Sequence, residues 1–488
     1  MVDFSHMPYA VGYFAPARFD AEVFDCEVRG TIPADLDGAF YRMHGDFLYP
    51  PLFTDDASLS ADGYISMFRI KNGGVDYRGR YVRTPRFEAQ RAARRQLYGY
   101  YRNPHTDDPS VRDLENVAYR AAANTTPVVL AGKLYATKED GPPFEIDPYT
   151  LETIGIEDFG GAWKSQTFTA HPKIDPATGD MIAFGYEASG LASTDVFLCT
   201  IGKDGKIKSE MRFDVPHVTM LHDIAITDRH IILPGSSAVT SRERLEQGKV
   251  HWGWDPTAGS YYGIIPRDGD PRNIRWFRGP DRSIVHVANA WSEGDKVFLD
   301  LPIADGNTWP FFADVHGGSF TMNPNRLKRL TFDLSADSDE VQEEFLFDQE
   351  VTSFTRIDER FTARPYRYTY VQYADREQPF DGKLPADQGR SQPNNSIGKF
   401  DLEMRTLQSF FAGPTHVTQE PVFVPRQGSV TEGDGYLLAT VHNLAEMRAE
   451  LVIVDAPTMT ELARVLLPFR NPNQVHATWA NAEELPLK

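Results

Sequence analysis

Four of the 13 histidines in the chain share one setting, because each stands at an end of an apolar run with the length of a β-strand. They are His171, His222, His286 and His476. Each lies too far from the next along the chain for a local zinc knuckle or a His-x-x-x-His helix, so only a closed tertiary fold could bring the four imidazoles together. The pattern predicts a metal centre with four nitrogen ligands.

The residues alone leave the identity of the metal open. Four neutral imidazoles suit iron, copper or zinc. Four protein ligands complete a tetrahedral zinc site, whereas an octahedral ferrous centre keeps two positions for dioxygen and water. Imidazoles that bind a metal usually donate their other N–H to a carboxylate. Glu139 and Glu420 stand in strand-like contexts that suit this role, although both could equally be solvated surface carboxylates.

The segments around these residues have the pattern of short β-strands. Apolar or β-branched runs recur along the whole chain, and turns rich in Gly, Asp, Asn and Pro separate them. Clear examples are residues 127–131, 181–186, 229–233, 296–301 and 435–441. Strand-turn-strand units without alternating helices predict an all-β protein built by radial repetition, a β-propeller. The inner strands of such a fold converge on its axis, where the four histidines would meet.

Composition narrows the classes of function. The 488 residues include 69 acidic and 50 basic side chains, a net charge of −19, which disfavours nucleic-acid partners. No run of about 18 apolar residues is present, so we expect no integral membrane segment. Two cysteines, Cys26 and Cys199, are too few for a disulfide framework, and the N-terminal residues lack the pattern of a secretion signal, which favours a cytoplasmic protein. No break in composition marks a second domain, so we expect one domain over residues 1–488.

Several motifs resemble those of the carotenoid cleavage oxygenase superfamily, and within it most closely those of the bacterial lignostilbene dioxygenases. The resemblance extends over essentially the whole chain, and its motifs are together highly specific. It is carried by residues 101–111, by Lys138-Glu139-Asp140-Gly-Pro-Pro, by residues 168–175 around His171, by Leu221-His222-Asp223, by His286 and by residues 420–426.

The resemblance implies a seven-bladed β-propeller with a cap of loops and short helices over a non-haem ferrous ion on the axis. The four histidines named above would bind the iron without any carboxylate ligand. By the same family pattern, Glu139 and Glu420 would each hydrogen-bond one of these histidines, and Thr125 would crowd a coordination position beside the oxygen site. The resemblance also implies a homodimer.

Lys138 and Tyr101 resemble the pair that holds the para-hydroxyl of the substrate in lignostilbene-type enzymes. A lysine ammonium close to a phenol lowers the pKa of the phenol from about 10 by favouring the phenolate. Electron density could then flow along the conjugated system to the alkene. We therefore expect an iron(II) dioxygenase that cleaves the central C=C bond of a phenolic stilbene, such as a lignostilbene or resveratrol, with O2 to give two aromatic aldehydes.

Three other functions stay open. An apocarotenoid cleavage oxygenase of the 15,15′ type would use the same metal centre without any need for Lys138. A non-catalytic propeller that serves as an interaction platform would keep the four histidines as core residues, which is the commoner role of a histidine taken singly. A zinc hydrolase is favoured less, because no obvious carboxylate base accompanies the histidines.

Three features depart from the family pattern. Ser353 stands where relatives commonly have glutamate, so one histidine would be held by Ser353 or by water. Leu59 stands where an aromatic residue facing the substrate is expected, and the segment 112–121 looks longer than in close relatives.

Trp309 and Phe312 could line a tunnel, where a flat conjugated substrate would stack on their rings.

Overall fold

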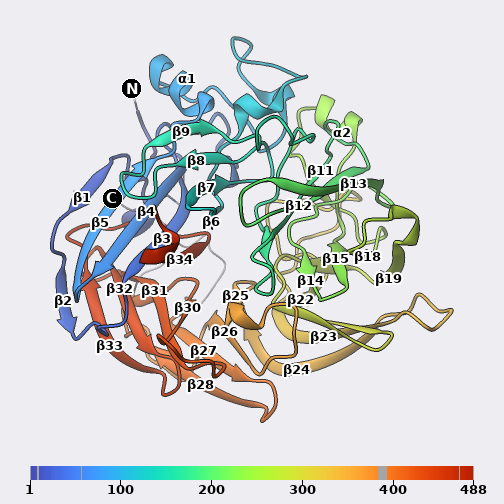
Figure 1. Ribbon diagram of the computed structural model, residues 1–488. Helices are drawn as coiled ribbons and strands as arrows, with labels where there is room; N and C mark the ends of the chain where they lie inside the picture. The colour runs from blue at the N-terminus through green and yellow to red at the C-terminus, as the bar shows by residue number, and fades with distance from the viewer. Residues whose placement is uncertain (1, 8–9, 57, 383–392, 472, 487–488) are drawn as a thin grey trace.

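Almost all regular structure of the protein is β-strand. The computed structural model describes residues 2–7, 10–56, 58–382, 393–471 and 473–486. In these ranges, seven antiparallel sheets of four to six strands stand around one axis like the blades of a propeller (Figure 1). A further two-stranded sheet pairs β16 (Ala238–Val239) with β17 (Gly253–Trp254). The predicted seven-bladed β-propeller is therefore confirmed.

Five blades are built from strands that follow one another along the chain. The first contains β6 (Thr126–Leu130), β7 (Lys133–Thr137), β8 (Phe144–Ile146) and β9 (Thr153–Ile156). The second contains β10 (Lys173–Ile174), β11 (Met181–Tyr186), β12 (Asp195–Ile201) and β13 (Ile207–Asp214). The third contains β14 (Ala225–Ile226), β15 (His230–Gly235), β18 (Ser260–Pro266) and β19 (Arg275–Gly279). The fourth contains β20 (Arg282–Ile284), β21 (Asn289–Glu293), β22 (Lys296–Asp305), β23 (Asn325–Asp333) and β24 (Gln342–Val351). The fifth contains β25 (Thr355–Ile357), β26 (Tyr368–Tyr373), β27 (Ser396–Asp401) and β28 (Thr406–Phe411).

Two blades combine strands from both ends of the chain and so close the ring. One contains β1 (Ala21–Val23), β3 (Gly38–Asp46), β4 (Asp62–Lys71), β5 (Gly74–Tyr81) and β34 (Ala477–Asn481). The other contains β2 (Glu27–Gly30), β29 (His416–Thr418), β30 (Val422–Pro425), β31 (Gly435–Asn443), β32 (Arg448–Asp455) and β33 (Thr460–Leu466). In the first of them Arg42 pairs with Ala477, and in the second Glu27 pairs with Leu466. Because β34 begins directly after His476, closure of the ring also places that histidine.

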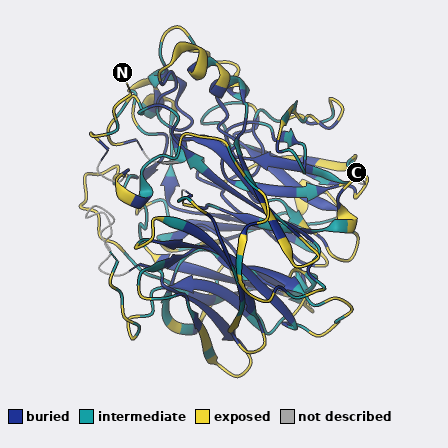
Figure 2. Ribbon diagram, turned by 90° about the vertical axis from the view of Figure 1, so that its left-hand side faces the viewer, coloured by how far each residue is buried: buried dark blue, intermediate teal, exposed yellow. Residues whose placement is uncertain are grey.

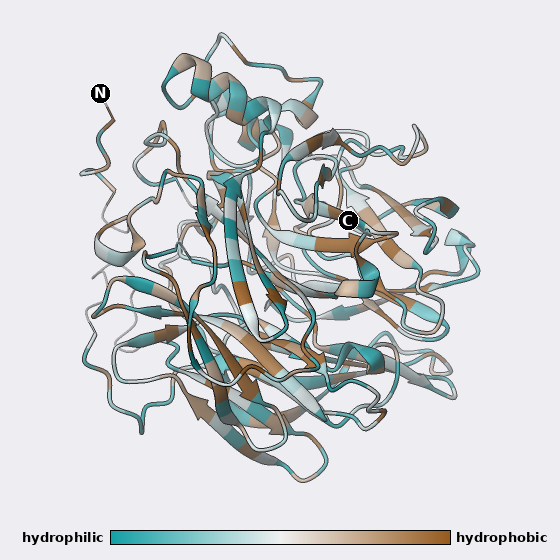
Figure 3. Cartoon of the chain, turned by 60° about the vertical axis from the view of Figure 1, so that its left-hand side comes forward, coloured by the Kyte–Doolittle hydropathy of each residue, from teal (hydrophilic) through white to brown (hydrophobic). Residues whose placement is uncertain are grey.

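The hydrophobic core lies largely between neighbouring blades. Middle strands such as β11 and β31 are buried at every position, because both of their faces are covered. Outer strands such as β13 alternate between buried and exposed positions over their second half, since one face meets solvent. Figure 2 shows buried residues in the interior strands and exposed residues on the outer loops, and Figure 3 shows hydrophobic positions mainly along the strands.

The connection between β5 and β6 carries helix α1 (Pro85–Ala93) at the edge of the propeller (Figure 1). The helix begins where it does because the Thr84 hydroxyl accepts a hydrogen bond from the Phe87 N–H at 3.1 Å and a proline fills the first helical position. The same connection carries Tyr101 into the interior, as described below, and so contributes the predicted cap. Within the described residues, neither α1 nor α2 (Arg242–Glu246) has the length or apolar character to span a bilayer.

Candidate metal centre

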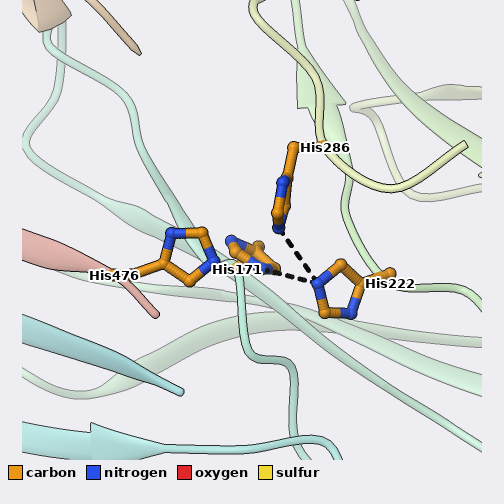
Figure 4. A group of neighbouring side chains, drawn as sticks. All are labelled: His171, His222, His286 and His476. Atoms are coloured by element: carbon orange, nitrogen blue, oxygen red, sulfur yellow. Dashed lines mark hydrogen bonds between the residues drawn. The ribbon is translucent and has the colours of Figure 1, made fainter. Parts of the chain in front are cut away.

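The four histidines singled out by their strand-end setting converge on one point (Figure 4). His171, His222 and His476 stand shortly before β10, β14 and β34, and His286 lies between β20 and β21. Each therefore comes from a different blade. One ring nitrogen of each lies within 4.8 Å of the others, and all four side chains are buried. The fold thus brings together four imidazoles that lie far apart in the sequence.

The ring nitrogens that face the centre lie within a few ångströms of one another. Nε2 of His222 lies 3.1 Å from Nε2 of His171 and 3.1 Å from Nε2 of His286. Nε2 of His476 is buried and has no hydrogen-bond partner among the described residues. Burial and the neighbouring imidazoles hold the pKa of His171 and of His286 well below the usual range, so both rings are neutral. Converging lone pairs of neutral imidazoles fit a bound metal cation.

Two buried glutamates set the tautomer of two of these rings. Glu139 Oε1 accepts from Nδ1 of His222 at 2.7 Å, and its Oε2 accepts from the Tyr101 hydroxyl at 2.8 Å. Glu420 Oε1 accepts from Nδ1 of His476 at 2.9 Å. Burial raises the pKa of both carboxyls, but nearby histidine and arginine side chains outweigh it and lower the pKa, so both are ionised. A ring that donates from Nδ1 keeps its Nε2 lone pair for the centre.

The other two histidines have no carboxylate partner among the described residues. Nδ1 of His286 lies 3.1 Å from both the hydroxyl and the main-chain oxygen of Ser353. The main-chain N–H of His171 donates to the Thr169 hydroxyl at 2.8 Å. Serine therefore occupies the place beside His286 that a carboxylate occupies beside His222 and His476.

Lys138 and Tyr101 lie together beside Glu139. The Lys138 ammonium stands over the Tyr101 ring, 4.7 Å from its centre, and both side chains are buried. Burial lowers the pKa of Lys138, and its Nζ donates to Oδ1 of Asn124 at 2.6 Å. Since Tyr101 donates to the carboxylate that holds His222, direct contacts link the lysine to the metal centre.

Asn124 belongs to this site and was not found from the sequence. Its Nδ2 donates to the main-chain oxygens of Leu59 at 3.3 Å and Ala61 at 2.8 Å. Its Oδ1 accepts from the Thr125 hydroxyl at 3.1 Å as well as from Lys138. Because both amide hydrogens are engaged, the oxygen is fixed toward the lysine. The only local signal for this role is that Asn124 directly precedes Thr125.

A second residue missed by the sequence reasoning is Arg102, which follows Tyr101 and is fully buried. Its Nη1 donates to the main-chain oxygen of Glu139 at 3.0 Å, and its guanidinium pairs with Glu187. His251 completes the network with Nε2 at 3.1 Å from Glu187. The network holds the main chain on both sides of the Tyr101–Glu139 contact. Its members are far apart in sequence, so no local pattern marks them.

The predicted pocket residues gather in one apolar cluster that also contains Tyr101. Phe312 is buried in this cluster, and Leu59 and Trp309 pack against it while partly exposed. The ring centres of Trp309 and Phe312 are 5.5 Å apart. The structure therefore places these three predicted pocket residues in the same apolar cluster as Tyr101, and aromatic rings of this kind suit a flat conjugated molecule.

Comparison with known families agrees with this architecture. The protein-family model described as Retinal pigment epithelial membrane protein matches residues 14–481. The chain belongs to this family, the carotenoid cleavage oxygenases. The match runs from before β1 to the end of β34, so it includes every blade and all four histidines. The resemblance drawn from the motifs is confirmed.

Individual relatives of this carotenoid cleavage oxygenase match it over nearly their full length. A lignostilbene-alpha,beta-dioxygenase isozyme III of Sphingomonas paucimobilis is 39% identical, with 100% of each chain covered. An isoeugenol monooxygenase of Pseudomonas putida is 38% identical, over 97% of this chain and 98% of its own. Among solved structures, the lignostilbene dioxygenase of Pseudomonas brassicacearum superposes with a TM-score of 0.93 at 36% identity, covering 99% of this chain and 100% of its own.

Proposed function

We propose that the protein is a non-haem iron(II) dioxygenase that cleaves the central C=C bond of phenolic stilbenes with O2 and gives two aromatic aldehydes. The observation that carries the proposal is the buried Lys138 ammonium over Tyr101, beside the four-histidine centre. A buried charge favours a phenolate, whereas a hydrocarbon polyene gains nothing from it. Relatives named for lignostilbene and for isoeugenol support the proposal, since both compounds are phenols conjugated to an alkene.

In this proposal the four histidines hold the iron, which when bound supplies the activation of dioxygen. Imidazole ligands suit iron, copper and zinc alike, so the choice of iron rests on the family, a class of non-haem iron enzymes. Glu139, Glu420 and Ser353 orient three of the rings through Nδ1. Thr125, buried beside Asn124, is assigned the role of crowding the oxygen side of the centre.

Lys138 and Tyr101 take different roles toward the phenol oxygen. Burial and the Glu139 carboxylate raise the pKa of Tyr101 well above its usual range, so its hydroxyl stays protonated and keeps donating its hydrogen bond to Glu139. Tyr101 can therefore accept a hydrogen bond from the neutral phenol but does not donate one to the phenolate. One N–H of the Lys138 ammonium donates to Asn124, which leaves two N–H groups that can donate to the phenol oxygen. The ammonium favours the phenolate, which donates electron density toward the alkene.

The decisive experiment compares substrates with and without the free hydroxyl. Ferrous-reconstituted protein is incubated aerobically with 4-hydroxystilbene, 4-methoxystilbene and an apocarotenal, while oxygen uptake and aldehyde products are followed. We expect rapid cleavage of the hydroxystilbene, at most a slow residual cleavage of the methoxystilbene, and no cleavage of the apocarotenal. Lys138→Met should nearly abolish cleavage of the hydroxystilbene, whereas Lys133→Met, at the half-exposed first residue of the strand β7 that ends just before Lys138, should leave it intact.

Other outcomes assign other functions. Cleavage of the apocarotenal, or equal cleavage of the hydroxystilbene and the methoxystilbene, would indicate an apocarotenoid cleavage oxygenase. The aliphatic side chain of Leu59 would suit such a substrate. Protein that takes up no stoichiometric iron under anaerobic ferrous reconstitution would be an interaction platform or hold another metal. One domain over residues 1–488, a homodimer and a cytoplasmic location stay predictions.

A further inference from the structure

One buried carboxylate contacts the main chain or a side chain near three of the four histidines. Oδ2 of Asp223 accepts a hydrogen bond from the Val287 N–H at 2.9 Å, and its Oδ1 lies 2.7 Å from Nζ of Lys173. Lys173 lies two residues after His171, Val287 follows His286, and Asp223 itself follows His222. The carboxylate therefore connects the segments of three histidines. We propose that Asp223 is a positioning residue that holds these three ligands in fixed relation around the metal.

The contacts of Asp223 leave its carboxylate little freedom. Its side chain is 2% exposed, and Oδ1 accepts a further hydrogen bond from the Ile224 N–H at 2.7 Å. Lys173 is 22% exposed at its side chain, so the ion pair reaches from the interior toward the surface. Removing one partner of such a pair leaves an uncompensated buried charge, which costs far more than the pair itself contributes. The three segments are therefore held together as one unit.

Glu420 makes the equivalent contact for the fourth histidine. Its Oε1 holds the His476 ring, and its Oε2 accepts from the main-chain N–H of the next residue, Ala477, at 2.9 Å. Asp223 likewise accepts from the N–H of the residue after His286, but it does not touch that ring. Among the described residues, Nδ1 of His286 is partnered by Ser353 and by no carboxylate, so the backbone contact to Asp223 supplies the charged anchor that this ligand otherwise lacks.

Asp223 also offsets a positive charge close to the centre. Lys173 lies two residues after His171, and its ammonium pairs with Asp223 at 2.7 Å, so its charge lies close to the ligand segments. That charge would repel a metal cation if it were not balanced. A neutral residue at position 223 would therefore remove the link between the segments and expose the centre to the ammonium, and an experiment must separate these two effects.

Cobalt(II) provides a probe that needs neither substrate nor oxygen. Metal-free protein is titrated with Co2+, and the dissociation constant, the visible d–d absorption of the ion and the melting temperature of the apo-protein are measured. Asp223→Asn should weaken Co2+ binding about 10- to 100-fold and change the absorption bands. The matched control is Glu450→Gln, because Glu450 on β32 is also a buried carboxylate, of 2% exposure, and pairs with Arg464 at 2.7 Å. Its other partners, Arg448, His416 and Asn443, do not belong to the four-histidine centre. It should lower the melting temperature without altering Co2+ binding or its spectrum.

The double variant Lys173→Met/Asp223→Asn separates position from charge and keeps the test available if Asp223→Asn alone does not fold. We expect it to bind Co2+ more weakly than the wild type and with altered bands. Wild-type affinity and spectrum in the double variant would show that Asp223 acts only through charge, and would refute the positioning role. So would an unchanged Asp223→Asn variant. The inference rests on the metal centre of the proposed function but not on its substrate, and wild-type protein that bound no Co2+ would overturn the centre itself.

Discussion

Replacement of Asn124 by leucine should reduce cleavage of a hydroxystilbene far more than cleavage of its methoxy analogue. The side chain of Asn124 holds the Lys138 ammonium through a 2.6 Å hydrogen bond, and its own orientation is fixed by two main-chain oxygens. Leucine has nearly the same shape but offers no acceptor. The ammonium would keep its contact with the Tyr101 ring and lose the group that aims it at the phenol oxygen.

The size of the effect follows from the burial of the lysine. Lys138 is 3% exposed, so water cannot replace the lost acceptor. A hydrogen bond to a charged group contributes about 1.5–3 kcal/mol. If that free energy is lost from the complex with the phenolate, kcat/KM for the hydroxystilbene should fall about 10- to 150-fold. The methoxy analogue cannot form a phenolate, so its residual rate should change little.

The assay measures kcat/KM for both stilbenes by aldehyde formation, together with the iron content of each preparation. Asn443→Leu is the matched control, because Asn443 is also a buried asparagine. Its Nδ2 donates to Glu450 at 2.9 Å, and Glu450 is not part of the four-histidine centre. An Asn124→Leu enzyme with normal iron and an unchanged ratio of the two rates would refute the idea that Asn124 acts through Lys138. An equal fall for both substrates would point to general damage at the site.

Further outcomes follow from the same contacts. His476→Ala should lose iron and activity together, measured by elemental analysis and oxygen uptake, whereas His442→Ala, at a buried histidine outside the centre, should keep stoichiometric iron. Ser353→Ala should weaken iron binding only a few-fold by metal titration, because the main-chain oxygen of Ser353 still contacts His286. The pKa of Lys138 lies below its usual value, so kcat/KM for the hydroxystilbene should fall as pH rises through that lowered pKa, with no such limb for the methoxy analogue.

The convergence of the four histidines could be predicted from sequence because a local pattern marks each of them. A strand end with a histidine is visible without knowledge of the fold, and the fold then places β10, β14 and β34 around one axis. The number of blades came from the family resemblance, which also assigned histidine contacts to Glu139 and Glu420, two residues that their strand-like contexts had only made candidates. Closure of the ring by β2 and β34 could not be derived, since alternation along a strand shows which face is buried but does not identify the partner strand.

Asn124, Arg102 and Asp223 were missed for a common physical reason. Each is a polar residue whose role is defined by partners remote in sequence, such as Val287, which lies 64 residues beyond Asp223. From local sequence alone, an aspartate in a loop is interpreted as a turn residue, and an arginine in a loop as a solvated side chain. Only the buried environment gives them a different role, because a buried polar group must find a partner within the fold.

The charges buried around the centre explain why a divalent ion suits it. Glu139 and Glu420 are ionised and hydrogen-bond imidazoles that are neutral ligands, so they place two negative charges just outside the ring of nitrogens. Positive side chains also lie close by: Arg356 contacts Glu420 at 3.4 Å, and the Lys138 ammonium stands over Tyr101, which donates to Glu139. The two carboxylates favour a bound cation through the imidazoles that they hydrogen-bond, and a glutamate in place of Ser353 would add a third negative charge. Buried charges are tolerated when they are balanced, and a bound metal would share that balance with Arg356 and Lys138.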